Sequence, residues 1–255
     1  MYKHTDYFTY REFVDRAMNR ERHSSNKDSS RTGSKNFTQS ESFDEAVDFA
    51  INGWDLGLEK YKIEEGIMSS GSTHMNPSLA GCLPHVQNYI MGFPQQMYDL
   101  YDEREYNLPT LDLVVSLGYA GRVRGSDALK FSKSVVTYIN KMSSSHNIRL
   151  TGIFSTKQSN TNYDTIVKLK DFDEAMVVNN IAFAFHPSFF RRLWFSIAES
   201  YSFLSSGYGT SRKNYKDVVC KAIDTSNTDK VVFTRDLGEL DNFSWSVEDI
   251  DSVTF

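Results

Sequence analysis

The sequence contains little cysteine and no long apolar run. Among its 255 residues only Cys82 and Cys220 are cysteines, and they are far apart and in no metal-binding spacing. We therefore expect a reduced, cytoplasmic compartment and no disulfide. No apolar run approaches the roughly 18 residues needed to span a bilayer. The first residues also lack the charged-then-apolar layout of a signal peptide, so no membrane association is expected.

Short motifs that identify catalytic or ligand sites are also missing. The chain has no G-x-x-x-x-G-K-[ST], no G-x-G-x-x-G and no G-x-S-x-G. Its six histidines are scattered, with no H-x-x-x-H and no C-x-x-C. The sequence therefore predicts no enzyme class, no metal ion and no cofactor.

Apolar side chains and an uneven charge distribution are what the sequence does have. Apolar residues make up 40% of the chain, with 18 Phe and 14 Tyr, which is ample for a packed core. The net charge is −5, yet residues 1–35 carry +3 and residues 224–255 carry −6. This distribution excludes a uniformly basic nucleic-acid binder, but it allows a local basic groove combined with an acidic tail.

Four regions are predicted along the chain. A short helix near residues 10–20 and a flexible polar linker occupy residues 1–40, and a helical part covers residues 41–108. An α/β core spans residues 109–235, and an acidic, unfolded tail follows over residues 236–255.

In the helical part, Ser42 lies three residues before Glu45, which is the spacing of a capping box. A helix is expected to begin there and to end at Gly53, with Trp54 packing down the next segment. Residues 66–84 are predicted to form a loop. Two short helical pieces are expected after it, separated at Gly92.

In the α/β core, strands and helices are predicted to alternate. Strands are expected at residues 108–119, 147–156, 163–170, 181–185 and 230–234. Helices are expected at residues 125–142, 188–201 and 215–223. This alternation predicts an α/β fold with a mostly parallel sheet flanked by helices on both faces, of the von Willebrand A or Rossmann type.

Two segments follow predicted strands, where ligands of open α/β sheets bind. Residues 116–126 form a glycine-rich segment in which Arg122 and Arg124 could attract an anion, although a plain glycine-rich turn is the alternative.

The second segment is "IAFAFHPSFFRRLWFSIAESY", residues 181–201. His186 or Ser188 could cap a helix here, and Arg191 and Arg192 in its first turns oppose the helix dipole and invite an anionic partner. The alternative is a strand-to-helix junction whose aromatic side chains belong to the core.

The acidic C-terminal stretch "DLGELDNFSWSVEDIDSVTF" ends in phenylalanine. It resembles the tails of bacterial and phage single-strand DNA-binding proteins, which compete with DNA for a basic groove and recruit partners. That resemblance implies a partner-binding role for Trp245, Asp249, Asp251 and Phe255. A solvated chain end is the alternative.

Residues 38–200 contain stretches such as "SESFDEAVDFAINGW" and "LDLVVSLGYAGRVRGSDALKFSKSVVTYI". These stretches resemble an uncharacterised family of phages and mobile elements, which implies the cytoplasm of an infected or host bacterial cell. The second stretch also resembles half of a von Willebrand A-type domain, with an apolar strand, a small-residue loop and a long helix. The metal site of that fold needs an Asp-x-Ser-x-Ser loop, but residues 116–120 here contain no carboxylate, so a metal-free form is implied.

Three hypotheses of function follow. The first is a non-enzymatic phage-type accessory protein that binds single-stranded DNA and recruits replication or transcription machinery. Its expected nucleic-acid contacts are Arg122, Arg124, Arg191, Arg192, Arg212 and Lys213. The second is a metal-free, von Willebrand A-like protein-interaction scaffold. The third is an enzyme with a site assembled from distant residues around His186.

Overall fold

The computed structural model describes most of the chain, and the fold is built from these parts. The described residues are 2–19, 32–54, 73–79, 83–102, 108–119, 121–143, 145–158, 161–172, 174, 178–201, 218, 221–222, 230–234 and 247–249.

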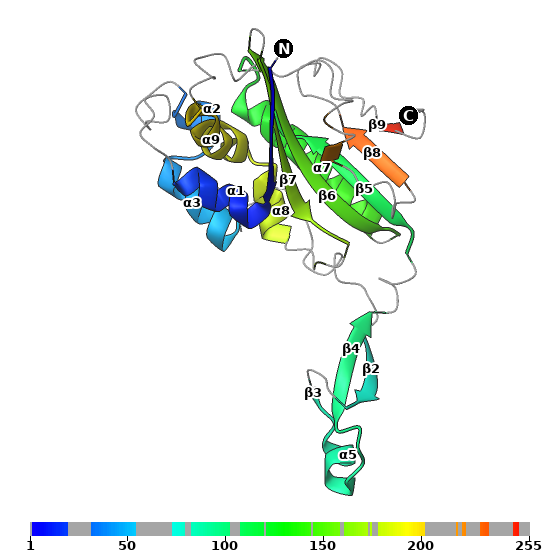
Figure 1. Cartoon of the computed structure of the whole chain (residues 1–255). Coiled ribbons are helices and arrows are strands. Elements are labelled where there is room, and N and C mark those ends of the chain that lie inside the picture. Colours follow the sequence, from blue (N-terminus) through cyan, green and yellow to red (C-terminus); the bar gives the residue numbers. More distant parts are fainter. Residues whose placement is uncertain are drawn as a thin grey trace.

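A six-stranded sheet forms the centre of the body (Figure 1). Its strands, in spatial order, are β1 (Tyr2–Thr9), β7 (Thr161–Lys170), β6 (Asn147–Gln158), β5 (Thr110–Ser116), β8 (Lys230–Thr234) and β9 (Val247–Asp249). Three of the five neighbouring pairs are parallel: β1 with β7, β5 with β6, and β5 with β8. The pairs β6–β7 and β8–β9 are antiparallel. The prediction of an α/β fold with a mostly parallel sheet is confirmed at this level.

Strand β5 is covered on both faces, as its continuous apolar run predicted. Leu111, Leu113 and Val115 belong to the large core on one face of the sheet. Val114 points the other way and packs with Ile153 and with Val218 of a short helical segment. Both faces of the sheet therefore carry helical cover.

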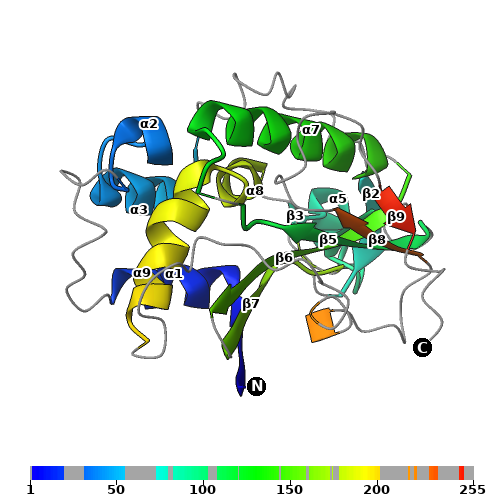
Figure 2. The ribbon, with the colours of Figure 1, turned by 90° about the horizontal axis from the view of Figure 1, so that it is seen from above.

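Helices cover the large-core face (Figure 2). Helix α7 (Gly125–Ser143) runs along this face, and its buried side chains include Val135, Val136 and Ile139. Helices α8 (Val178–Ala184), α9 (Phe195–Glu199) and α1 (Tyr10–Met18) continue this cover toward β7.

Local sequence signals at Ser42 and Gly53 start and stop one helix where predicted. Helix α3 (Phe43–Asn52) begins where the Ser42 side chain accepts a hydrogen bond from the Glu45 backbone N–H at 3.0 Å. The return bond of the expected capping box goes elsewhere, because the Glu45 side chain accepts from the Glu41 N–H. It ends at Gly53, whose φ of 90° suits glycine. Trp54 is buried immediately after it.

Two predictions for the N-terminal region are wrong. Residues 2–9 form strand β1, which was not expected. Residues 32–40, expected to be flexible linker, include helix α2 (Lys35–Thr38) and the buried side chains of Thr38 and Ser40. Oxygen atoms of this segment accept hydrogen bonds from buried side chains elsewhere in the chain. Composition alone did not reveal this role. Residues 20–31 of the expected linker lie outside the described residues.

The segment after β7 is helical throughout, so the predicted strand at residues 181–185 is wrong. These residues belong to α8 and the turn after it. A π-helix, η2 (Phe189–Trp194), follows and continues into α9. The described side chains from Ile181 to Ala198 are buried all round, which makes apolar periodicity uninformative there.

Aromatic rings join this segment to the sheet. Phe154 of β6 stacks on Phe190 with ring centroids 5.6 Å apart and on Trp194 at 5.5 Å. The Trp194 indole N–H donates to the Thr165 hydroxyl on β7 at 2.9 Å, so the one polar group of this large ring is satisfied.

An arm formed by residues 73–102 extends away from the body (Figure 1). Its strands are β2 (Thr73–Ser78), β4 (Met97–Asp102) and β3 (Leu83–Pro84), and both β2 and β3 pair antiparallel with β4. Helix α5 (Val86–Met91) lies at its far end. The first expected short helix is confirmed by α5, but the second is wrong because strand β4 occupies its place. The expected loop at 66–84 is likewise wrong over residues 73–78.

The acidic tail contributes one described element. Residues 247–249 form β9 against β8, so the prediction of an entirely unfolded tail is wrong at these positions. No described helix combines the length and the apolar character that crossing a membrane requires.

Candidate protein-interaction site

Arg191 and Arg192, predicted to contact nucleic acid, are both fully buried on the π-helix η2. Arg191 donates to the backbone oxygens of Phe37 and Val123, both at 2.6 Å. Its guanidinium also stacks on the Phe37 ring, 3.7 Å from the centroid. Burial lowers the pKa of Arg191 below its ordinary value.

Arg192 is held in the same manner by the segment just before α3. Its Nε donates to the Ser40 hydroxyl at 2.6 Å, and its Nη2 donates to the backbone oxygens of Gly33 at 2.7 Å and Ser40 at 3.0 Å. Both arginines thus bind carbonyl and hydroxyl oxygens of residues 33–40 and 123, and neither exposes its guanidinium to a phosphate. Arg191 and Arg192 are therefore removed from the set of proposed nucleic-acid contacts.

His186 and Ser188 belong to the same buried region. The His186 ring packs against Trp54, with centroids 4.4 Å apart, and its Nδ1 accepts from the Ser188 backbone N–H at 3.2 Å. The Ser188 hydroxyl donates to the backbone oxygen of Thr38 at 2.7 Å and bonds the Ser40 hydroxyl at 2.8 Å. His186 follows a helix and not a strand, and its aromatic surroundings give it a packing role.

The remaining predicted residues are widely distributed. Arg122 and Arg124 are exposed in the segment between β5 and α7, at the carboxyl end of β5. Asp249 is in β9, paired with Val232. Arg212, Lys213, Trp245, Asp251 and Phe255 lie outside the described residues. The structure thus brings Arg191 close to the Arg122–Arg124 segment through Val123, but in a structural role.

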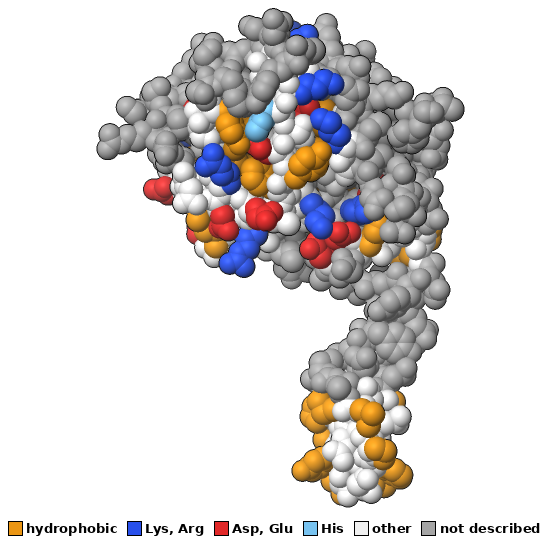
Figure 3. Space-filling model, viewed as in Figure 1, with side chains coloured by type: hydrophobic (Ala, Val, Ile, Leu, Met, Phe, Trp, Pro, Cys, Tyr) orange, Lys and Arg blue, Asp and Glu red, His pale blue; other side chains and the backbone are white. Residues whose placement is uncertain are grey.

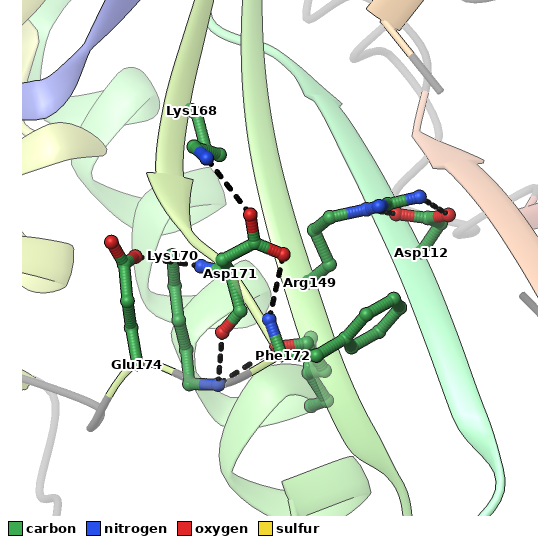
Figure 4. Close-up of polar contacts among 8 residues, drawn as sticks. Asp112, Arg149, Lys168, Lys170, Asp171, Phe172 and Glu174 are labelled. Carbon is green, nitrogen blue, oxygen red and sulfur yellow. Dashed lines mark hydrogen bonds and ion pairs between the residues drawn. The ribbon is translucent and has the colours of Figure 1, made fainter. Parts of the chain in front are cut away.

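A polar network joins β5, β6 and β7 at the end of the sheet that lies opposite to the carboxyl end of β5 (Figure 4). Arg149 forms a two-pronged ion pair with the buried Asp112, at 2.5 and 2.6 Å, and its guanidinium lies 4.7 Å from the Phe172 ring centroid. Lys170 donates to the backbone oxygens of Ile148 and Asp171, at 3.0 and 2.8 Å. These contacts hold the end of β7 against β6. They lie next to the point where the register between β6 and β7 shifts, at Leu150 and Thr151.

Asp171 completes this network. Partial burial raises its pKa, but the hydrogen bonds from the Lys168 ammonium at 2.8 Å and the Phe172 N–H at 2.9 Å outweigh that effect. The net result is a pKa below the ordinary value, so Asp171 stays ionised and paired. The network therefore has a structural role, because it holds the ends of these strands together.

A second cluster, unexpected from sequence, surrounds Asp6 on β1. The hydroxyls of Tyr163 and Tyr201 both donate to Asp6 Oδ2, at 2.8 and 2.6 Å, and His4 Nε2 lies 3.1 Å from Oδ1. Burial, and next the charge of Asp6, raises the pKa of the Tyr163 phenol. These contacts tie β1 to β7 and to the end of α9. Within the described ranges, no three His, Cys, Asp or Glu side chains gather closely enough to hold a metal ion.

The end of the arm presents a different kind of surface, which we call the tip and define as Leu79 together with residues 85–96. Large apolar side chains here are more than half exposed: Leu79 75%, Val86 60%, Tyr89 69%, Ile90 75%, Met91 61% and Phe93 52%. Figure 3 shows this end of the molecule as orange and white, whereas the described surface of the body carries blue and red together with orange. No Asp, Glu, Lys or Arg occurs anywhere from Gly66 through Tyr98.

Hydrogen bonds, and not an apolar core, hold the tip in shape. His85 stacks on Tyr98 at 4.3 Å and caps α5 by accepting from the Asn88 N–H at 3.3 Å. The Asn88 side chain donates to the Gln95 backbone oxygen at 2.8 Å. Helix α5 has no buried residue, so its apolar side chains are free to face outward. Val86, Tyr89 and Ile90 lie at i, i+3 and i+4 and so share one helical face.

Exposed groups of large apolar side chains mark interaction sites. The sequence analysis missed this one, although one signal for it was present: an uncharged stretch in a chain whose overall charged content is 24%. The tip is therefore our candidate functional site, and its chemistry suits contact with another apolar protein surface.

Comparison with known proteins gives one match. A family model described as "Domain of unknown function (DUF7192)" matches residues 4–250, a range that contains both the body and the arm. No curated protein and no solved structure matches the chain.

Proposed function

We propose, from the premise that this chain belongs to the DUF7192 family, that it is a non-enzymatic protein-interaction scaffold whose contact surface is the tip of the arm. The observation that carries the proposal is the group of exposed large apolar side chains on a segment without any charge. Burial of apolar surface is the main favourable term in protein association, and exposed Tyr, Phe and Met side chains are typical of interface cores.

The body serves as a rigid support for the arm in this proposal. Its succession of β5, a small-residue segment and the long helix α7 is consistent with the proposed likeness to von Willebrand A-type domains. Residues 116–120 contain no carboxylate, so we propose that binding needs no divalent cation.

Site-specific photo-crosslinking tests the scaffold. A photoreactive residue is placed at position 90 in the tip and, as the matched control, at position 51. Ile51 is also an isoleucine and is 57% exposed, but it lies on α3 in the body. We expect discrete protein adducts from position 90 only. An excess of unlabelled parent chain should abolish these adducts by competition, whereas an excess of the Ile90→Ser variant should not. A chelator should leave the yield of adducts unchanged. Equal adducts from both positions would contradict the proposal.

Binding of single-stranded DNA by a phage-type accessory protein that recruits replication or transcription machinery is the second candidate. The exposure of Arg122 and Arg124 beyond the carboxyl end of β5 favours it. We expect Arg122→Ala/Arg124→Ala to weaken salt-dependent binding of a labelled oligonucleotide. The matched control is Lys130→Ala/Lys133→Ala, which removes the same charge from exposed positions of α7. Equal weakening in both variants would show only a general charge effect.

A further inference from the structure

We propose that the tip binds the tip of a second copy of this chain, so that two copies form an arm-to-arm dimer. This inference rests on the proposed scaffold function and names its first partner. The argument depends on what a twofold contact demands of a surface, since such a contact places each patch against its own copy.

Charge is the first demand. In a twofold contact every charged side chain near the axis meets its own like charge, which is repulsive unless another group compensates for it. The tip needs no such compensation, because no Asp, Glu, Lys or Arg occurs from Gly66 through Tyr98. Asp99 and Asp102 come only farther along β4, toward the body end of the arm.

Hydrogen bonding is the second demand. A surface that meets itself must carry groups that both donate and accept. The exposed polar side chains of the tip have this property: Gln87 and Gln95 carry amides, and Tyr89 carries a phenol. These groups can pair with their own copies across an axis, which a surface of carboxylates or ammonium groups cannot do.

Area is the third demand. The six exposed apolar side chains offer at most roughly 600–700 Å² per copy, so a contact that covered all of them on both copies would reach about 1,200–1,400 Å², which is the lower end of specific interfaces. The shared face of Val86, Tyr89 and Ile90 on α5 gives this surface a ridge that can pack against the same ridge of the second copy.

Sedimentation velocity of the full-length chain over a wide concentration range tests the dimer. We expect a concentration-dependent dimer that Ile90→Ser weakens by about a hundredfold or more, as for a central interface residue. Ile51→Ser, the matched exposed isoleucine on the body, should leave the dimer unchanged. A chain that stays monomeric overturns the inference, as does a dimer that is indifferent to Ile90→Ser.

Charge complementation identifies the partner as the same surface. Tyr89 is exposed on the shared face of α5. We expect Tyr89→Glu and Tyr89→Lys each to be monomeric, because like charges then face each other, and an equal mixture of the two to form dimers. Failure of the mixture to associate, when each variant alone has lost the dimer, would place the second copy's contact elsewhere and overturn the inference.

The crosslinking experiment separates the two levels of the proposal. If the parent chain is monomeric but position 90 still yields competed adducts with another protein, the dimer is wrong and the scaffold stands. If position 90 yields no competed adducts and the chain is monomeric, both are wrong.

Discussion

The segment from Ile181 to Ala198 buries charged side chains, whereas the tip of the arm exposes apolar ones. The body segment buries two adjacent arginines, while the tip exposes six large apolar side chains. The arginines are accommodated because residues 33–40 and 123 supply backbone and hydroxyl oxygens for their donors. Among the described residues, the tip buries none of these apolar side chains, and local hydrogen bonds and the His85–Tyr98 stack hold its shape.

This contrast shows where function is to be sought in the molecule. Charged residues looked functional in the sequence, but packing turned Arg191 and Arg192 into internal connectors. Apolar residues looked like core, but on the arm they form the largest group of exposed hydrophobic side chains among the described residues. The first and the last of three predictions test whether the two regions differ as described, and the second tests the polar cluster at Asp6.

The largest effect of changing a charged residue is expected in the buried segment. Arg192→Ala should lower the free energy of unfolding by about 2–4 kcal/mol, because it removes the hydrogen bonds that the guanidinium donates to the buried oxygens of Gly33 and Ser40. Urea denaturation followed by tryptophan fluorescence measures it, since Trp54 and Trp194 are buried in the body. Arg192→Lys should restore only part of the loss, because an ammonium lacks the planar fork of donors.

The exposed Arg122→Ala serves as the control and should change the free energy by no more than about 0.5 kcal/mol. A loss below about 1 kcal/mol for Arg192→Ala would show that the buried network contributes little net stability.

An intermediate effect is expected at high pH. Burial, followed by the charge of Asp6, raises the pKa of Tyr163 above its ordinary value, so the folded chain keeps this phenol protonated where the unfolded chain ionises. The stabilising contribution is fully present below pH ~10 and is lost as the pH rises above that value. Above pH ~10 the free energy of unfolding therefore falls as the pH rises. Tyr163→Phe should make this fall less steep, by up to ~1.4 kcal/mol per pH unit. Urea titrations on both sides of pH ~10 measure this slope; an unchanged slope contradicts the assignment.

The smallest effect is expected at the tip. Ile90→Ser should change the free energy of unfolding of the body by less than about 0.5 kcal/mol, measured at a dilution where the chain is monomeric. Its counterpart in the body, Phe154→Ala, should cost about 3–5 kcal/mol because Phe154 is fully buried within the aromatic stack. A large loss for Ile90→Ser would mean that the tip supports the fold, and the distinction between the two regions would fail.

Local signals predicted the fold where neighbours in sequence decide the structure. The Ser42 cap, the buried run of β5 and the apolar side of α7 all follow from residues within a few positions of one another. The same signals failed at residues 181–185, because an apolar run that is buried all round fits a strand or a helix equally well. They also failed at β1, whose partner β7 lies more than 150 residues away.

The sequence by itself determined the α/β class, the main helix starts and the absence of charge from the tip. Only the tertiary structure decided that Arg191 and Arg192 are internal, that residues 32–40 are ordered and that the tip faces outward. The reason is that a polar group can be buried only where distant segments supply its partners, and an apolar group is exposed only where no such segment arrives. Both conditions depend on the arrangement of the whole chain.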